Sequence, residues 1–145
     1  MFETGIPPSV PHTIDSLSSR FTRFEYSFVP LVTRDLGVYC VLDILFLRPD
    51  PPGGAVRSGD IDNRMKTLFD AIGMPKEAVH VGRETTPAAD EVPFFCLVED
   101  DSVITKLSVE TDRLLSEVSG KSDVHLVITV RLHPIAITMA NMAFA

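Results

Sequence analysis

Two acidic residues near the middle of the chain, with a lysine one helical turn beyond them, are the side chains best suited to chemistry. Asp60 and Asp62 stand two residues apart, and Lys66 follows four residues after Asp62. Carboxylate oxygens are the ligands that Mg²⁺ prefers. A bound divalent cation can activate water and offset the charge of a phosphate group. The spacing is therefore compatible with a metal-dependent hydrolytic site.

The residues around this acidic pair predict the helix that would position it. Apolar residues recur at helical spacing from 61 to 72, which indicates a helix with one buried face. Gly73 follows the last of them and predicts the end of the helix, with Pro75 just beyond. The opposite face then presents the polar residues of the segment: Asp62, Asn63, Lys66 and Asp70.

A purely structural role would explain the same residues. Either aspartate could be the N-cap of the helix, a role worth about 0.5–2 kcal/mol. Acidic side chains in a first helical turn also suit the helix dipole. Asp62 and Lys66 could form an exposed ion pair worth about 0.2–0.5 kcal/mol. The first acidic pair alone leaves both interpretations open.

A second acidic cluster, Glu99-Asp100-Asp101, precedes a predicted strand. Such a corner is commonly an ordinary turn. Both clusters, however, lie at the ends of regular elements. If they converge, several carboxylates share one small space, which is unfavourable unless a cation is present or one carboxyl is protonated. A magnesium site built of carboxylates and waters would remove this repulsion.

The order of these motifs resembles the RusA family of Holliday-junction resolvases. That family's pattern is D-x-D-N-x-x-K, then a helix end similar to D-A-L, then a D-D pair before a strand. Here the matching residues are Asp60-Ile61-Asp62-Asn63 with Lys66, then Asp70-Ala71, then Asp100-Asp101. The resemblance spans roughly residues 38–130 in the order of the elements and is tight at the two motifs.

The resemblance implies a homodimeric endonuclease that uses Mg²⁺, with Mn²⁺ as an alternative, to resolve four-way (Holliday) junctions in DNA recombination and repair. Its three aspartates would bind the metal, and its lysine would neutralise the scissile phosphate or protonate the leaving oxygen. Asp101 is matched to the family's metal ligand because that ligand is the second of the Asp-Asp pair. The catalytic residues implied in this chain are Asp60, Asp62, Lys66 and Asp101. Supporting roles are implied for two neighbours, Asn63 and Asp100.

The charge of the chain differs from that of the family, whose members are basic. The net charge is −7, and residues 67–145 hold six Lys and Arg against twelve Asp and Glu. Binding DNA through counterion release requires clustered Lys and Arg. Contacts to DNA should therefore come from the first half of the chain and the helix. The candidates for phosphate contacts are four arginines: Arg34, Arg48, Arg57 and Arg64.

Two other functions stay open. A non-catalytic RusA-like dimeric interaction module would keep the fold without a basic DNA-binding surface, which the acidic second half favours. A metal-dependent phosphohydrolase with a different nucleic-acid substrate would use residues 73–93, which have no counterpart in the family pattern, as a lid.

The remaining pattern predicts a small α+β (mixed α/β) domain. It indicates a sheet of about four to five strands, with the principal helix packed on one face. The whole chain, 1–145, is expected to form one RusA-like domain. The expected strands are 23–28, 38–47, 94–98, 103–110 and 124–132. Three other segments are expected to be an irregular arm at 1–20, an insertion or flap at 73–93 and an apolar tail at 134–145.

Composition places the chain among single-domain globular proteins. It has 145 residues, of which 45% are hydrophobic. Cys40 and Cys96 lie in apolar runs and are predicted to be buried thiols in a reducing compartment, without zinc-binding spacing. The chain has no signal-peptide pattern and no apolar run of about 18 residues. We therefore expect a cytoplasmic protein that does not associate with membranes.

Overall fold

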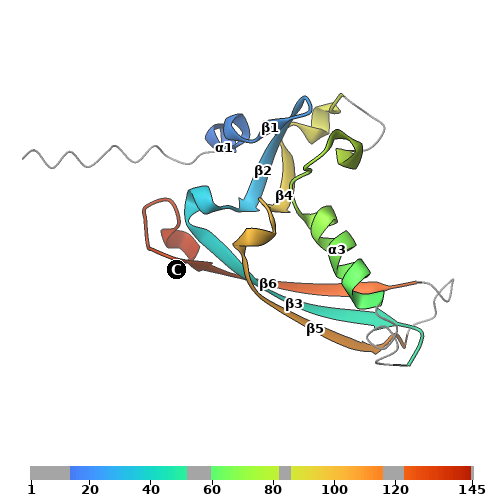
Figure 1. Cartoon of the computed structure of the whole chain (residues 1–145). Helices are drawn as coiled ribbons and strands as arrows, with labels where there is room; N and C mark the ends of the chain where they lie inside the picture. The colour runs from blue at the N-terminus through green and yellow to red at the C-terminus, as the bar shows by residue number, and fades with distance from the viewer. Residues whose placement is uncertain (1–13, 52–59, 82–85, 116–122, 145) are drawn as a thin grey trace, which may run out of the picture.

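Two helices and two three-stranded sheets make up the part of the chain that the computed structural model describes, residues 14–51, 60–81, 86–115 and 123–144 (Figure 1). The α+β class predicted from the sequence is confirmed. The strands are divided between two sheets, whereas a single small sheet was expected. This division follows from pairings between segments that are far apart in the sequence, which hydrophobic periodicity does not reveal.

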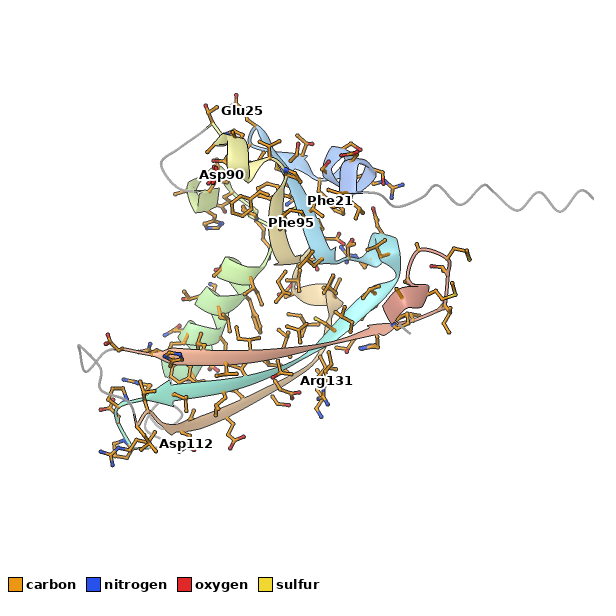
Figure 2. All side chains as sticks on the ribbon, turned by 180° about the vertical axis from the view of Figure 1, so that it is seen from behind. Phe21, Glu25, Asp90, Phe95, Asp112 and Arg131 are labelled. Carbon is orange, nitrogen blue, oxygen red and sulfur yellow. The ribbon has the colours of Figure 1, made fainter. Side chains whose placement is uncertain are left out.

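The longer sheet has the order β5-β3-β6. Its central strand β3 (Val38–Arg48) pairs in parallel with β5 (Ile104–Arg113) and antiparallel with β6 (His125–Pro134). Along β3 the even-numbered residues from 38 to 46 are buried and the odd-numbered ones are half-buried, the alternation expected of a strand. A helix, described below, covers one face of this sheet. Figure 2 shows Arg131 of β6 on the opposite face.

Helix α3 (Asp60–Ile72) lies on the inner face of the long sheet, as predicted (Figure 1). Its buried Met65 packs against Ile44 and Phe46 of β3. The helix ends at Ile72, and the N–H of Gly73, the next residue, donates to the carbonyl of Phe69 at 3.0 Å. Since one face of α3 packs on the sheet, its polar residues remain at the surface.

The shorter sheet has the order β1-β2-β4. Strand β2 (Tyr26–Val32) pairs antiparallel with β1 (Thr22–Arg23) and in parallel with β4 (Phe94–Val98). The prediction of one continuous strand at 23–28 is wrong, because these residues belong to two strands, β1 and β2. The chain turns at residues 24–25, and the strand that follows continues as far as Val32.

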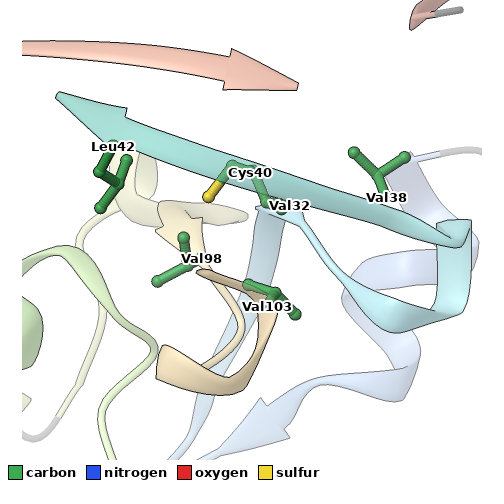
Figure 3. Packing of buried hydrophobic residues seen from close by; sticks show 6 residues of the cluster. All are labelled: Val32, Val38, Cys40, Leu42, Val98 and Val103. Carbon is green, nitrogen blue, oxygen red and sulfur yellow. The ribbon is translucent and has the colours of Figure 1, made fainter. Parts of the chain in front are cut away.

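The main core lies where the two sheets meet (Figure 3). The backbone N–H of Glu99 donates to the carbonyl of Val32 at 2.9 Å, so the parallel ends of β2 and β4 stay together. This contact holds the first residue of the acidic cluster, Glu99, at the end of β2. The fully buried cluster consists of Val32, Val38, Cys40, Leu42, Val98 and Val103.

Short helices occur in two segments whose sequences show no clear periodicity, and one of them, 73–93, was expected to be either a flap or the site of a short helix near 76–80. Residues 14–20, expected within an irregular arm, form α1 (Ile14–Arg20), so that expectation is wrong for them. Residues 1–13 lie outside the described part of the chain. Within 73–93, η2 (Ala78–Val81) and η3 (Ala89–Glu91) are single 3₁₀ turns.

The buried side chain of Asn141 holds the apolar C-terminal tail against the rest of the fold. The Nδ2 of Asn141 donates to the carbonyls of Leu36 and Ala136 at 2.8 and 2.9 Å. Its Oδ1 accepts the N–H of Thr138 at 2.8 Å.

Among the residues described, no helix is long and apolar enough to cross a bilayer. Among the described residues of the tail, four large apolar side chains are exposed: Ile135, Ile137, Met139 and Met142.

Candidate active site

A cleft of about 570 Å³ brings the two acidic motifs together. Asp62 and Lys66 reach it from α3. Asp100 and Asp101 reach it from the turn at the start of η4 (Asp101–Val103). Residues of the two motifs, which are separated in the sequence by most of the helix, the segment 73–93 and β4, therefore share one surface.

Apolar side chains from the helix and the long sheet form the rest of the cleft wall. Met65 and Phe69 come from α3, and Leu107 and Val109 come from β5. Since Met65 also packs on β3, the helix is fixed to the sheet beside the polar residues of the cleft. The core thus supports one wall of the cleft directly.

Several polar side chains of the cleft, Asp70 of α3 among them, are available to a ligand. Asp62, Lys66 and Asp101 are exposed. Within the described part of the chain, none of their side chains forms an ion pair or a hydrogen bond. A ligand could therefore bind them without breaking an internal contact.

Asp100 is engaged on both of its carboxylate oxygens. Oδ1 accepts the N–H of Ser102 at 2.8 Å and also the Ser102 hydroxyl, and Oδ2 accepts Nη2 of Arg34 at 2.9 Å. Burial raises the pKa of Asp100, but the hydrogen bonds from Ser102 and the charge of Arg34 outweigh it and hold the pKa below its ordinary value. Asp100 is thus the ionised N-cap of η4, which leaves Asp101 as the available member of the pair.

Two other residues of the helical motif are not described in this cleft. Asp60 is the first residue of α3, and its side chain lies outside the described part of the chain. Asn63 lines a separate groove beside Phe46 and Leu126, between α3 and the long sheet. The structure therefore does not bring Asn63 into the cleft with Asp62.

The arginines expected at phosphates have other surroundings where they are described. Nη2 of Arg48 pairs with Asp50 at 3.1 Å. The Arg64 guanidinium lies 5.7 Å from the centre of the Phe46 ring. Arg57 lies outside the described residues. Neither Arg48 nor Arg64 lines the cleft.

Sequence reasoning missed two basic side chains of the cleft, Lys76 and His80. Both are exposed and come from the segment after α3. They add an ammonium group and an imidazole to the wall that also holds Lys66. Their residue types were visible in the sequence, but residues 74–93 have no periodicity, so nothing indicated which way these side chains point.

The available donors fit a hard divalent cation. Within the described residues, no three side chains of His, Cys, Asp or Glu lie close enough together to hold a metal ion. Asp62 and Asp101 nevertheless offer two unpaired carboxylates in one cleft. Mg²⁺ is often held by one or two carboxylates, with waters and substrate phosphates completing its coordination. The two aspartates suit Mg²⁺ or Mn²⁺ in this way.

Comparisons of the chain with protein-family models, with curated proteins and with solved structures found no match. A functional assignment therefore depends on the chemistry of the cleft and on the motifs, because a fold by itself does not define an activity.

Proposed function

We propose that this protein is a Mg²⁺-dependent DNA endonuclease that cuts four-way junctions in recombination and repair, acting as a homodimer of RusA type. The observation that supports this most is the common cleft of Asp62, Lys66 and Asp101. Two carboxylates and an ammonium group that line one cleft suit metal-assisted hydrolysis of a phosphodiester.

The two aspartates and the lysine have different tasks in this proposal. Asp62 and Asp101 bind the metal, together with Asp60, which belongs to the same motif. Bound Mg²⁺ would supply a Lewis acid that lowers the pKa of a water ligand and offsets charge on the phosphate. Lys66 lies one helical turn from Asp62, where its ammonium can neutralise a phosphate oxygen or protonate the leaving oxygen.

Lys76 and His80 extend this assignment to substrate binding. Both line the cleft that holds the acidic residues. A strongly acidic cleft repels DNA, so basic side chains at its edge are needed to admit a phosphate group. We assign Lys76 and His80 to phosphates that flank the scissile bond.

Cleavage of labelled DNA tests the proposal. A four-way junction, a flap and a linear duplex would each be incubated with the protein and Mg²⁺, beside two variants. Asp62→Asn removes a proposed metal ligand at nearly constant volume, and its control, Asp90→Asn, changes an exposed aspartate of η3 that does not line the cleft. We expect Mg²⁺-dependent cuts in the junction, a loss of about 100-fold or more in Asp62→Asn, and no loss in Asp90→Asn.

Other outcomes would assign the chain differently. Cutting of the flap or of single strands with the junction left intact would identify a phosphohydrolase with another nucleic-acid substrate. A folded chain that cuts none of the substrates would support a non-catalytic interaction module. That second candidate is favoured by the net charge of −7 and by the pairing of Arg34 and Arg48 with acidic partners.

A further inference from the structure

Arg34 forms hydrogen bonds with three of the four residues of the segment 99–102, called the acidic turn below. Its Nη2 donates to Oε1 of Glu99 at 3.0 Å and to Oδ2 of Asp100 at 2.9 Å. Its Nη1 donates to Oγ of Ser102 at 2.7 Å. Asp101 is the one residue between 99 and 102 that forms no hydrogen bond with Arg34. A planar guanidinium with several donors is well suited to fix such a turn.

The other end of this network is buried. Thr33 is fully buried, and its hydroxyl donates to Oε2 of Glu99 at 2.7 Å. The backbone N–H of Arg34 donates to the same oxygen at 3.2 Å. The Glu99 side chain is only 14% exposed. These contacts connect the end of β2 to the acidic turn more firmly than an isolated surface ion pair could.

We propose that Arg34 is a positioning residue of the metal site, and this inference rests on the function proposed above. Arg34 holds Glu99 and Asp100 to the end of β2, so that Asp101 is the carboxylate of the turn that is left for the cation. It also neutralises two carboxylates that would otherwise compete with Asp101. Arg34 acts through these neighbours and does not touch the substrate.

The direction of the effect on metal affinity separates this role from a simple electrostatic one. Removing a positive charge beside acidic residues would by itself strengthen the binding of a cation. Releasing the turn would weaken binding, because Asp101 would no longer be held in place. Weaker binding after the loss of Arg34 therefore indicates positioning.

Binding of Mn²⁺ without DNA, measured by electron paramagnetic resonance, tests the proposal on the full chain. Arg34→Gln removes both the positive charge and the planar guanidinium that donates to three residues. Arg34→Lys keeps the positive charge but not the guanidinium. Arg20→Gln is the matched control, because Arg20 forms an ion pair of 2.9 Å with Asp35 and is similarly exposed, 45% against 48% for Arg34. We expect Mn²⁺ binding about 10-fold weaker in Arg34→Gln, an intermediate loss in Arg34→Lys and no change in Arg20→Gln.

Hydrogen exchange supplies a second readout that does not involve metal. The amide of Ser102, which donates to Asp100, should exchange faster in Arg34→Gln than in Arg20→Gln. Unchanged or tighter Mn²⁺ binding in Arg34→Gln would overturn the proposal, as would unchanged exchange at Ser102. A wild-type chain that binds no Mn²⁺ overturns it as well. The expected Mn²⁺ pattern in a chain that cuts no DNA supports this proposal and refutes the endonuclease.

Discussion

At the scale of single residues, two adjacent aspartates differ because their partners differ. Asp100 accepts hydrogen bonds from Ser102 and Arg34, whereas the side chain of Asp101 has no partner among the described residues. The resemblance to the RusA motif implies Asp101 as the metal ligand only because it is the second residue of the Asp-Asp pair. The structure supplies a physical reason for the same choice, since an uncommitted carboxylate is the better ligand.

The two cysteines show how burial changes reactivity. Both are free, and Cys40 is fully buried in the core. Burial raises the pKa of the Cys96 thiol to about 11 and also raises the pKa of Cys40. At pH 8 roughly one Cys96 thiol in a thousand is then ionised, against about one in four for an ordinary cysteine.

Because the thiolate is the reactive form, native protein should react with Ellman's reagent at pH 8 at least about 100-fold more slowly than protein in urea. Raising the pH towards 10 should speed the native reaction, since ionisation of Cys96 increases as the pH approaches its raised pKa. If both thiols of native protein reacted as fast as those of protein in urea, Cys40 and Cys96 would not be buried as the structure has them.

At the scale of elements, the hairpin between β1 and β2 adopts an unfavourable backbone. Phe24 and Glu25 form its two-residue loop, with φ of 53° and 68°. Positive φ at both positions is what a type I′ turn requires, and Asn-Gly is the preferred pair there. A side chain in this region costs roughly 1–2 kcal/mol relative to the right-handed region.

Glu25→Gly should therefore raise the free energy of unfolding by about 0.5–1 kcal/mol, the relief of this strain less the added backbone entropy of glycine. The same change at Glu110, an exposed position of β5, should lower it by about 1 kcal/mol because glycine weakens a strand. Urea denaturation of both variants measures the difference. A loss of stability in Glu25→Gly equal to that in Glu110→Gly would rule out the turn.

Local patterns predicted some elements well and others poorly. The bounds of α3 could be predicted because its apolar spacing and Gly73 agree. The strand at 23–28 was predicted wrongly for two reasons. Phe24 and Glu25 are not residues that usually form turns. Alternation of polar and apolar residues is also the same whether a segment is one strand or contains a hairpin turn. The parallel pairing of β2 with β4 joins distant segments and leaves no local signal.

At the scale of the whole molecule, tertiary structure determines the site. The sequence could suggest that Asp62 and Asp101 meet, because two acidic clusters are most easily explained by a common cation. It could not reveal the Arg34 network, whose members are 65 to 68 residues apart. The net charge of −7 further implies that any DNA is recognised through the cleft, since an acidic surface offers little general attraction.

In the function proposed here, Asp62 and Asp101 serve one metal-dependent reaction. The most direct test is the rate of Mg²⁺-dependent cleavage of a four-way junction by wild type, by Asp62→Asn, by Asp101→Asn and by the double variant. Residues that act as one unit have non-additive effects. We predict that each single change lowers the rate by about 100-fold or more and that the double variant falls no further. Losses that multiply in the double variant would show that the two aspartates act independently, and a wild type that leaves the junction uncut would show that the protein is not a junction endonuclease.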